Sequence, residues 1–436
     1  MNTTQEGLKR EVGVWGLSAN IVNIIVGAGI FVLPAIIAEA MGASGVLAYL
    51  FCGLLIGLVM LCFAEVGSKV THSGGSYTYV ETAFGPYPGF LVSIFFLMGN
   101  VFADAAVSNA LVEIFGMVFP VFKNQYVRIL TLFLIFAGLV TLNVVGVKQG
   151  IGLVKINTVA KLIPLFLLIT IGWKDVQLTN LYWESTPTIR QFGEASLILF
   201  FAFQGGDAGL TIGGEIKNPQ KTVPRAIFIG ISFVLFLYIM IQLISQGILG
   251  NELTNFKEAP LAETAKVVFG PLGYTLLFVG TGISMFGMIS GSILNSPRVL
   301  FRMSRDGVIP FSRLASIHHL FKTPYLAILL YAVLGYTIAS IGGFRQLAVI
   351  ATSSMLLVYF GVSLSVLRLR KMKDLDNGGF KIPFGYTVPI LSAGIILFFL
   401  SNLTGFEIRG MLILIVVLTV IYFLGKAYRM WKKNKG

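Results

Sequence analysis

Apolar residues along this chain occur in continuous runs rather than in alternation with polar residues. Runs of about 20 residues recur over the whole sequence, and this is the length that a helix needs to cross a hydrocarbon core of about 30 Å. The strands of a membrane barrel would instead alternate apolar and polar residues. Because lipid offers no partners to backbone polar groups, the pattern predicts an all-α, multi-pass membrane protein.

Hydropathy predicts twelve transmembrane helices joined by short connections. The predicted segments are approximately residues 14–40, 44–67, 88–119, 127–146, 151–173, 192–213, 223–249, 269–296, 325–341, 346–367, 385–403 and 409–428. No low-complexity linker or additional soluble domain interrupts this series. We therefore expect a single transmembrane domain over residues 1–436.

The composition agrees with this interpretation, because 56% of the residues are hydrophobic and only 12% are charged. With the N-terminus inside, 23 of the 32 lysines and arginines fall in predicted cytoplasmic segments, 8 fall on the opposite side, and Lys161 lies within a helix. By the positive-inside rule both termini are then cytoplasmic, and we expect the plasma membrane as the location. The net charge of +13 indicates contact with anionic lipid headgroups rather than with nucleic acid.

Two of the predicted helices contain glycine clusters where leucines would be expected. The first helix carries the sequence GAG at Gly27–Gly29, and the sixth carries Gly205 and Gly206. Such clusters can simply let helices pack closely. However, these two helices are the first members of two successive five-helix groups, and paired glycine interruptions of this kind indicate a transporter binding site. Unwound backbone and half-helix N-termini there would attract a carboxylate.

Charged residues within the predicted helices are the next candidates, since a buried charge in a membrane is costly and often functional. Asp104 lies one turn beyond Asn100, so the two side chains face nearly the same way. Its carboxylate can bind a ligand ammonium, bind a proton, or pair with another residue of the chain. Asp207 has the same three alternatives, with more weight on proton binding or gating. Lys161 can extend its ammonium toward the cytoplasmic interface or have a function at membrane depth.

Several other classes of function lack their motifs. There is no Walker A sequence, so we expect no ATPase subunit. His72, His318 and His319 have no nearby cysteine partners, so no zinc or other metal site is expected. No pairing of a nucleophile with a base stands out at membrane depth, so we expect neither an enzyme nor a cofactor.

Three segments carry a resemblance to a known family. These are VGAGIFVLP from Val26, FAFQGGDAGLTIGGEIKNPQKTVPRAI from Phe201, and RVLFRMSRDGVIP from Arg298. They resemble the signature segments of the amino acid–polyamine–organocation superfamily of transporters. The resemblance covers nearly the whole chain and implies a five-plus-five inverted-repeat fold with discontinuous helices 1 and 6. The first repeat would cover residues 1–174, the second 192–369, and two peripheral helices 385–428.

The resemblance also implies roles for individual residues. Ala28 and Gly29 match backbone positions that hold the substrate carboxylate, and the Ile25 carbonyl matches one that faces the α-ammonium. Phe201 matches an aromatic residue that caps the substrate, while Phe203 and Gln204 match positions that line the pocket. Asn100 matches a position that recognises the substrate side chain in some antiporters. Asp207 departs from the pattern, because relatives often carry glutamate there.

For Lys161 the resemblance favours a position against unwound helix 1 and helix 8, where sodium-coupled relatives hold a sodium ion. A fixed ammonium there would make transport sodium-independent, and a desolvated one could also take up and release a proton. We therefore expect a sodium-independent secondary active transporter of amino acids that works by alternating access, either as an exchanger or as a proton-coupled symporter. The alternative is a carrier of polyamine, arginine or another organic amine. A sensor or scaffold with the same fold is a further alternative that no residue favours.

Overall fold

The computed structural model describes residues 12–70, 75–145, 151–183, 186–207, 216–305, 307–309, 311–321, 323–372 and 379–433. These residues form helices and no strands; one isolated parallel bridge joins Val12 and Ile216. The α-helices are α1 (Val14–Ile25), α2 (Gly29–Met41), α3 (Val46–Lys69), α4 (Ser76–Phe84), α5 (Pro86–Val118), α6 (Gln125–Val145), α7 (Ile151–Ile171), α8 (Ile189–Leu199), α9 (Pro219–Leu249), α10 (Pro260–Asn295), α11 (Pro297–Arg305), α12 (Tyr325–Ile341), α13 (Phe344–Leu369), α14 (Thr387–Ser401) and α15 (Gly405–Lys433).

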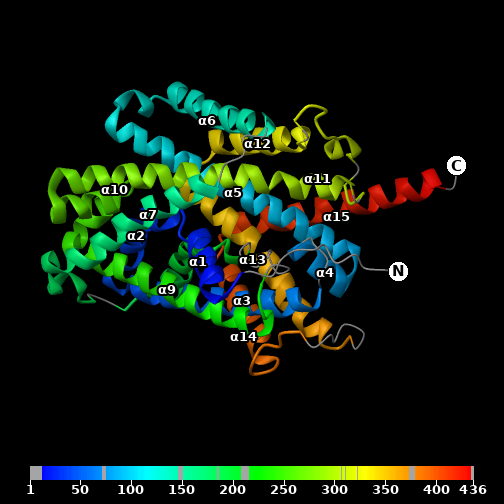
Figure 1. The fold of residues 1–436 in the computed structure, drawn as a ribbon, viewed down its shortest axis with the longest axis horizontal. Coiled ribbons are helices and arrows are strands. Elements are labelled where there is room, and N and C mark those ends of the chain that lie inside the picture. Colours follow the sequence, from blue (N-terminus) through cyan, green and yellow to red (C-terminus); the bar gives the residue numbers. More distant parts are fainter. Residues whose placement is uncertain are drawn as a thin grey trace.

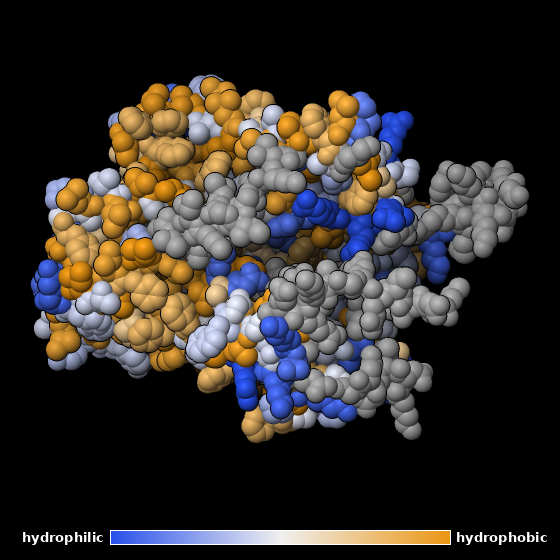
Figure 2. Space-filling view, viewed as in Figure 1, coloured by the Kyte–Doolittle hydropathy of each residue, from blue (hydrophilic) through white to orange (hydrophobic). Residues whose placement is uncertain are grey.

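Long apolar helices dominate this part of the chain. Among the described residues, seven helical stretches are long and apolar enough to cross a membrane, and three further apolar helices are shorter. The all-α prediction is confirmed for the described residues, whereas the count of twelve crossings stays a prediction. On the face shown in Figure 2, apolar residues cover one flank of the molecule, and hydrophilic residues gather toward the end where α4 and α11 lie in Figure 1.

The helices pack around a central group. In this group α13 packs against α5, while α1 and α3 both pack against α9. Outside it, α12 and α6 lie side by side along one edge (Figure 1). Helix α15 is peripheral, and apolar side chains such as Leu412, Ile413 and Val416 remain exposed along it. Such a helix presents its apolar surface to lipid.

Two short helices, α4 and α11, lie outside every predicted segment. Hydropathy finds long apolar runs, whereas α4 has only nine residues and α11 is amphipathic, with Arg298, Arg302 and Arg305 in its nine residues. The predicted segment 269–296 also differs, because α10 begins earlier and bends at Gly270, where φ is 70°. Gly270 is followed by Pro271, so the apolar run begins at this bend rather than at the start of the helix.

Candidate functional site

The first predicted helix is interrupted at its glycine cluster. Helix α1 ends at Ile25, α2 begins at Gly29, and Val26–Ala28 between them are not helical. The last carbonyls of α1 and the first N–H groups of α2 therefore have no partners within their own helices. This arrangement provides acceptors and donors at the same place, as the sequence predicts for the two ends of an amino acid.

The sixth predicted helix is interrupted as well. Helix α8 continues as a 3₁₀ turn over Phe200–Phe203, Gln204 is extended, and Gly205 has a φ of 91°. A side chain at Gly205 would be strained at this φ, since left-handed backbone favours glycine. The predicted continuation of the segment through 208–213 lies outside the described residues.

The two interruptions lie against each other. A Cβ atom added to Gly29 would come within 2.7 Å of the Cβ of Ala202 and 2.8 Å of its Cα. A Cβ added to Gly206 would come within 2.9 Å of the Ile25 side chain. At Gly29 the neighbour is backbone of the other interruption, which cannot give way, whereas at Gly206 it is the end of a flexible side chain. Two glycine clusters far apart in the sequence therefore form one region.

Tyr238 of α9 connects the two interruptions. Its hydroxyl lies 3.0 Å from the carbonyl oxygen of Ile25 and 3.0 Å from that of Ala202. A hydroxyl carries a single proton, so it donates to one of these carbonyls at a time. The Ile25 carbonyl that the resemblance assigns to a substrate ammonium thus shares this donor with the Ala202 carbonyl and keeps at least one lone pair. Sequence analysis missed Tyr238, because one tyrosine in an apolar helix gives no signal of its partners.

Phe203 packs with its ring fully buried in an aromatic cluster beside this connection. Its neighbours are Tyr49 of α3 and Tyr238, with ring centroids 6.4 and 5.1 Å away. The Phe203 side chain therefore packs against α3 and α9 and stabilises the second interruption.

Lys161 of α7 is buried, and its ammonium donates to the backbone carbonyl of Asn23, 2.7 Å away. This carbonyl belongs to the last turn of α1, where the helix dipole favours positive charge. The side chain is therefore buried, with its ammonium against the end of helix 1, and a role of this ammonium in coupling stays a prediction. The predicted eighth helix, α10, packs against α7 as well.

Asp104 and Asn100 lie one turn apart on α5, but their polar groups have different partners. The Asn100 amide donates to the Phe96 carbonyl of its own helix at 2.8 Å. Asp104 is 1% exposed, and its Oδ2 accepts a hydrogen bond of 2.7 Å from the hydroxyl of Tyr331 on α12. Its Oδ1 has no hydrogen-bond partner among the described residues.

Three residues of the second interruption are held by α13. The Gln204 amide donates to the Thr352 hydroxyl at 2.9 Å, and the Tyr359 hydroxyl donates to Asp207 at 2.8 Å. The Phe201 ring packs edge-on against Phe344 with centroids 5.8 Å apart.

Gly27 of the first interruption has a different neighbour, since a Cβ there would lie 3.3 Å from the sulfur of Met288 on α10. The predicted site residues of the two interruptions, together with Lys161, thus lie where the interruptions meet α7, α9, α10 and α13. The contacts of Asn100 and Asp104 are instead with α5 itself and with α12, and the roles of all these residues stay predictions.

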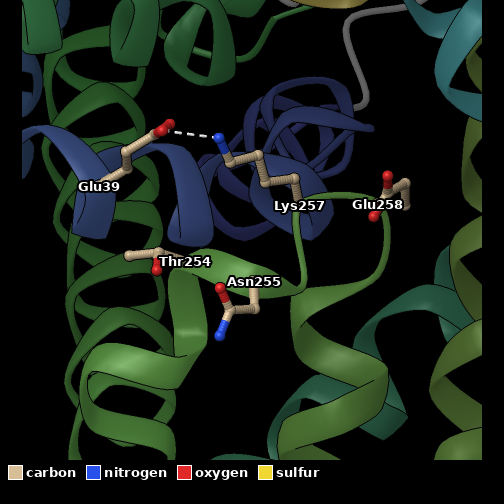
Figure 3. A pocket seen from close by; sticks show the side chains of 5 residues that line it. All are labelled: Glu39, Thr254, Asn255, Lys257 and Glu258. Atoms are coloured by element: carbon tan, nitrogen blue, oxygen red, sulfur yellow. Dashed lines mark hydrogen bonds and ion pairs between the residues drawn. The ribbon is translucent and has the colours of Figure 1, made fainter.

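Other charged residues form ion pairs away from the interruptions. Glu65 of α3 binds Arg370 through two hydrogen bonds of 2.7 and 2.6 Å and also accepts from the Ile382 N–H. Glu39 pairs with Lys257 at 2.6 Å beside an open pocket of about 530 Å³, which contains no predicted site residue (Figure 3). No group of three metal-ligating side chains occurs in the described part of the chain.

Comparison with known proteins finds amino acid transporters with similar sequences. The chain is 29% identical to the serine/threonine exchanger SteT of Bacillus subtilis (strain 168), over 90% of both chains. It is 26% identical to the branched-chain amino acid permease BcaP of the same organism, over 96% of this chain and 94% of the permease. The mouse Asc-type amino acid transporter 1 is 29% identical, over 97% of this chain and 82% of the transporter. The sequence profile of the amino acid permease family matches residues 12–422, and the chain therefore belongs to that family.

Proposed function

We propose that this protein is a sodium-independent secondary active transporter of amino acids. It works by alternating access in the plasma membrane, as an exchanger or as a proton-coupled symporter. The observation that carries the proposal is the Lys161 ammonium on the Asn23 carbonyl, 2.7 Å away at the end of α1. A fixed cation beside the helix interruption leaves no need for a sodium ion there.

The backbone at the first interruption suits the two charged ends of an amino acid. The free N–H groups at Ala28 and Gly29 begin α2, and a helix N-terminus stabilises a carboxylate. The ammonium end would use carbonyls at the end of α1, including the remaining lone pair of Ile25. In this proposal twelve crossings form two inverted repeats, residues 1–174 and 192–369, with 385–428 peripheral and both termini cytoplasmic.

Neutral amino acids suit this site better than cationic ones. A carrier of cationic substrates needs a carboxylate that faces the ligand, and Asp104 and Asp207 are both buried and each accept a hydrogen bond from a buried tyrosine. The names of the relatives, which include a serine/threonine exchanger and a branched-chain amino acid permease, support the same choice. The side-chain pocket would be formed near Asn100, Phe201 and Gln204.

Transport in proteoliposomes tests the proposal. Purified protein is reconstituted, and uptake of radiolabelled L-serine, L-threonine and L-leucine is measured under separate sodium, proton and counter-substrate gradients. We expect accumulation driven by counter-substrate or by protons, at a rate that replacing sodium with choline leaves unchanged. Strict dependence on sodium would overturn the proposal, and so would selective uptake of agmatine or arginine.

The substitution Lys161→Ala tests the role of the ammonium. Removing a buried, charge-assisted hydrogen bond of about 1.5–3 kcal/mol should lower transport by roughly one to two orders of magnitude or uncouple it, with the protein still in the membrane. Lys174→Ala is the matched control, because that lysine is exposed in the turn that follows the same helix. Normal coupled transport by the Lys161 variant would leave the ammonium with a structural role only.

A further inference from the structure

A line of hydroxyl groups leads away from Asp104 to the end of α10. Tyr331 donates to the Asp104 carboxylate at 2.7 Å. The Tyr331 oxygen lies 3.3 Å from the Ser292 hydroxyl, which lies 3.4 Å from the Ser296 hydroxyl. Ser296 caps the C-terminal end of α10, immediately before the arginine-bearing helix α11. The line therefore joins a carboxyl group at mid-helix in α5 to the end of another helix.

Asp104 itself is an unusual group to bury. It is 1% exposed, and one carboxyl oxygen has no hydrogen-bond partner among the described residues. An ionised carboxylate is costly in such surroundings unless a cation or several donors compensate its charge, and a carboxyl group that lacks them favours its neutral, protonated form. Two neutral hydroxyl groups, those of Tyr331 and Ser292, give Asp104 much less than such compensation.

Among the residues that the structure describes, none forms an ion pair with Asp104. The Tyr331 hydroxyl of α12 donates to it, and the Ser292 hydroxyl of α10 lies next to both that hydroxyl and the carboxyl group. On α13 the neighbouring contact is apolar, between Met355 and Gly99. Arg128 of α6 donates to Asn109, five residues further along α5, and to the last carbonyls of α12. Glu113 lies further still along α5 and carries the same sign as Asp104.

Hydroxyl groups both accept and donate hydrogen bonds, so a file of them can pass a proton along by successive exchange. The two steps at Ser292 are longer than the usual 2.7–2.8 Å of an O–H···O bond. The file is therefore connected by long hydrogen bonds in this conformation. A small approach of α10 to α12 would shorten the step between Ser292 and Tyr331, whereas the step from Ser292 to Ser296 lies within α10 and its C-cap. The hydroxyl file thus connects a proton acceptor to Ser296, a buried serine at the end of α10.

We infer that Asp104 is a proton-binding site, and that Tyr331, Ser292 and Ser296 relay its proton to the end of α10. The proton binds to the carboxylate in one conformation and leaves through the hydroxyl file in another. In that step each hydroxyl accepts a proton from one neighbour and passes its own proton to the next, so every O–H bond broken in the file is replaced by one formed. This inference rests on the proposed transport function and selects its proton-coupled form. It assigns Asp104 to coupling rather than to a ligand ammonium.

Infrared difference spectroscopy tests the site without any transport measurement. Purified protein in lipid nanodiscs is compared between acidic and alkaline buffer, and the C=O stretching band of protonated carboxyl groups is recorded. We expect a band that is lost in Asp104→Asn, shifted in Tyr331→Phe and retained in Asp175→Asn, whose carboxyl group lies in the 3₁₀ turn Gly172–Asp175 after α7. An unchanged band in Asp104→Asn would overturn the inference.

Proton movement in proteoliposomes tests the relay. A pH-sensitive dye inside the vesicles follows protons when L-serine or L-threonine is added outside. We expect Ser292→Ala and Ser296→Ala to slow proton entry, while Ser284→Ala does not, since that buried serine of α10 has no hydrogen-bond partner in the described chain.

Amino acid exchange without proton movement in the unaltered protein would overturn the coupling while leaving the transport proposal intact. Selective loss of agmatine binding in Asp104→Asn would overturn it in favour of a charged ligand site.

Discussion

At the scale of single residues, two glutamates form ion pairs that differ in their exposure to solvent. Glu65 is 1% exposed and binds both Arg370 and the Ile382 N–H, whereas Glu39 is 43% exposed and pairs only with Lys257. A buried charge that loses its partner costs far more than an exposed one, because it remains desolvated. The two glutamates therefore form a matched pair for experiment.

We predict that Glu65→Gln destabilises the protein by about 3–5 kcal/mol, the cost of leaving a buried charge unpaired. Glu39→Gln should cost only about 0.2–1 kcal/mol, as is usual for exposed pairs. The thermal unfolding midpoint in detergent, followed by tryptophan fluorescence, measures both. Equal shifts for the two variants would show that the Glu65 pair is compensated by water.

Two glycines should respond in opposite directions to the same substitution. In Gly29→Ala the new methyl group would meet Ala202 at 2.7 Å and force the two interruptions apart, whereas Gly138 of α6 has nothing within 4 Å. We expect Gly29→Ala to abolish stabilisation by a bound amino acid in a thermal-shift assay. Gly138→Ala should keep that stabilisation and raise the baseline stability by roughly 0.5–1 kcal/mol. Retained ligand stabilisation in Gly29→Ala would contradict the close approach.

At the scale of elements, the segment before α1 is tied to the segment before α9. The Val12 carbonyl accepts a hydrogen bond of 2.9 Å from the Lys217 N–H, beside the bridge to Ile216. Further along, the Ser18 hydroxyl of α1 reaches the Ala226 carbonyl of α9 at 3.3 Å. Helix α1 therefore packs along one side against α9, and the residue before α1 is hydrogen-bonded to the segment before α9.

We predict that α1 and α9 move as one body during transport. A disulfide between Val12→Cys and Ile216→Cys should then form on oxidation and leave the transport rate unchanged. The single-cysteine variants are the controls, and the natural Cys52 and Cys62 are both buried. Loss of transport that a reductant reverses would mean that these segments separate when the site opens.

At the scale of the whole molecule, the positive-inside pattern predicts which surface faces the cytoplasm. Asn255 is exposed just before α10, in a predicted outer connection, and Ser312 is exposed just after α11, in a predicted inner one. We expect a membrane-impermeant maleimide to label Asn255→Cys in intact cells. Ser312→Cys should be labelled only after permeabilisation. The reverse result would invert the predicted orientation and place both termini outside.

The sequence by itself determined the class of structure and the places where the helices are interrupted. Apolar runs long enough to cross a membrane favour helices. Glycine clusters within these runs indicate where the helices are interrupted. The positions of Gly27–Gly29 and Gly205–Gly206 could be found for this reason. Hydropathy did not find α4 or α11, because neither is long or apolar.

The tertiary structure alone decided which groups meet. Lys161 could extend to the interface or bind inside, and only the position of α7 beside α1 places its ammonium on the Asn23 carbonyl. Tyr238 and Tyr331 give no signal in the sequence, yet one connects the two interruptions and the other holds Asp104. The physical reason is that periodicity fixes which face of a helix a side chain occupies, whereas its partner depends on packing between helices far apart in the chain.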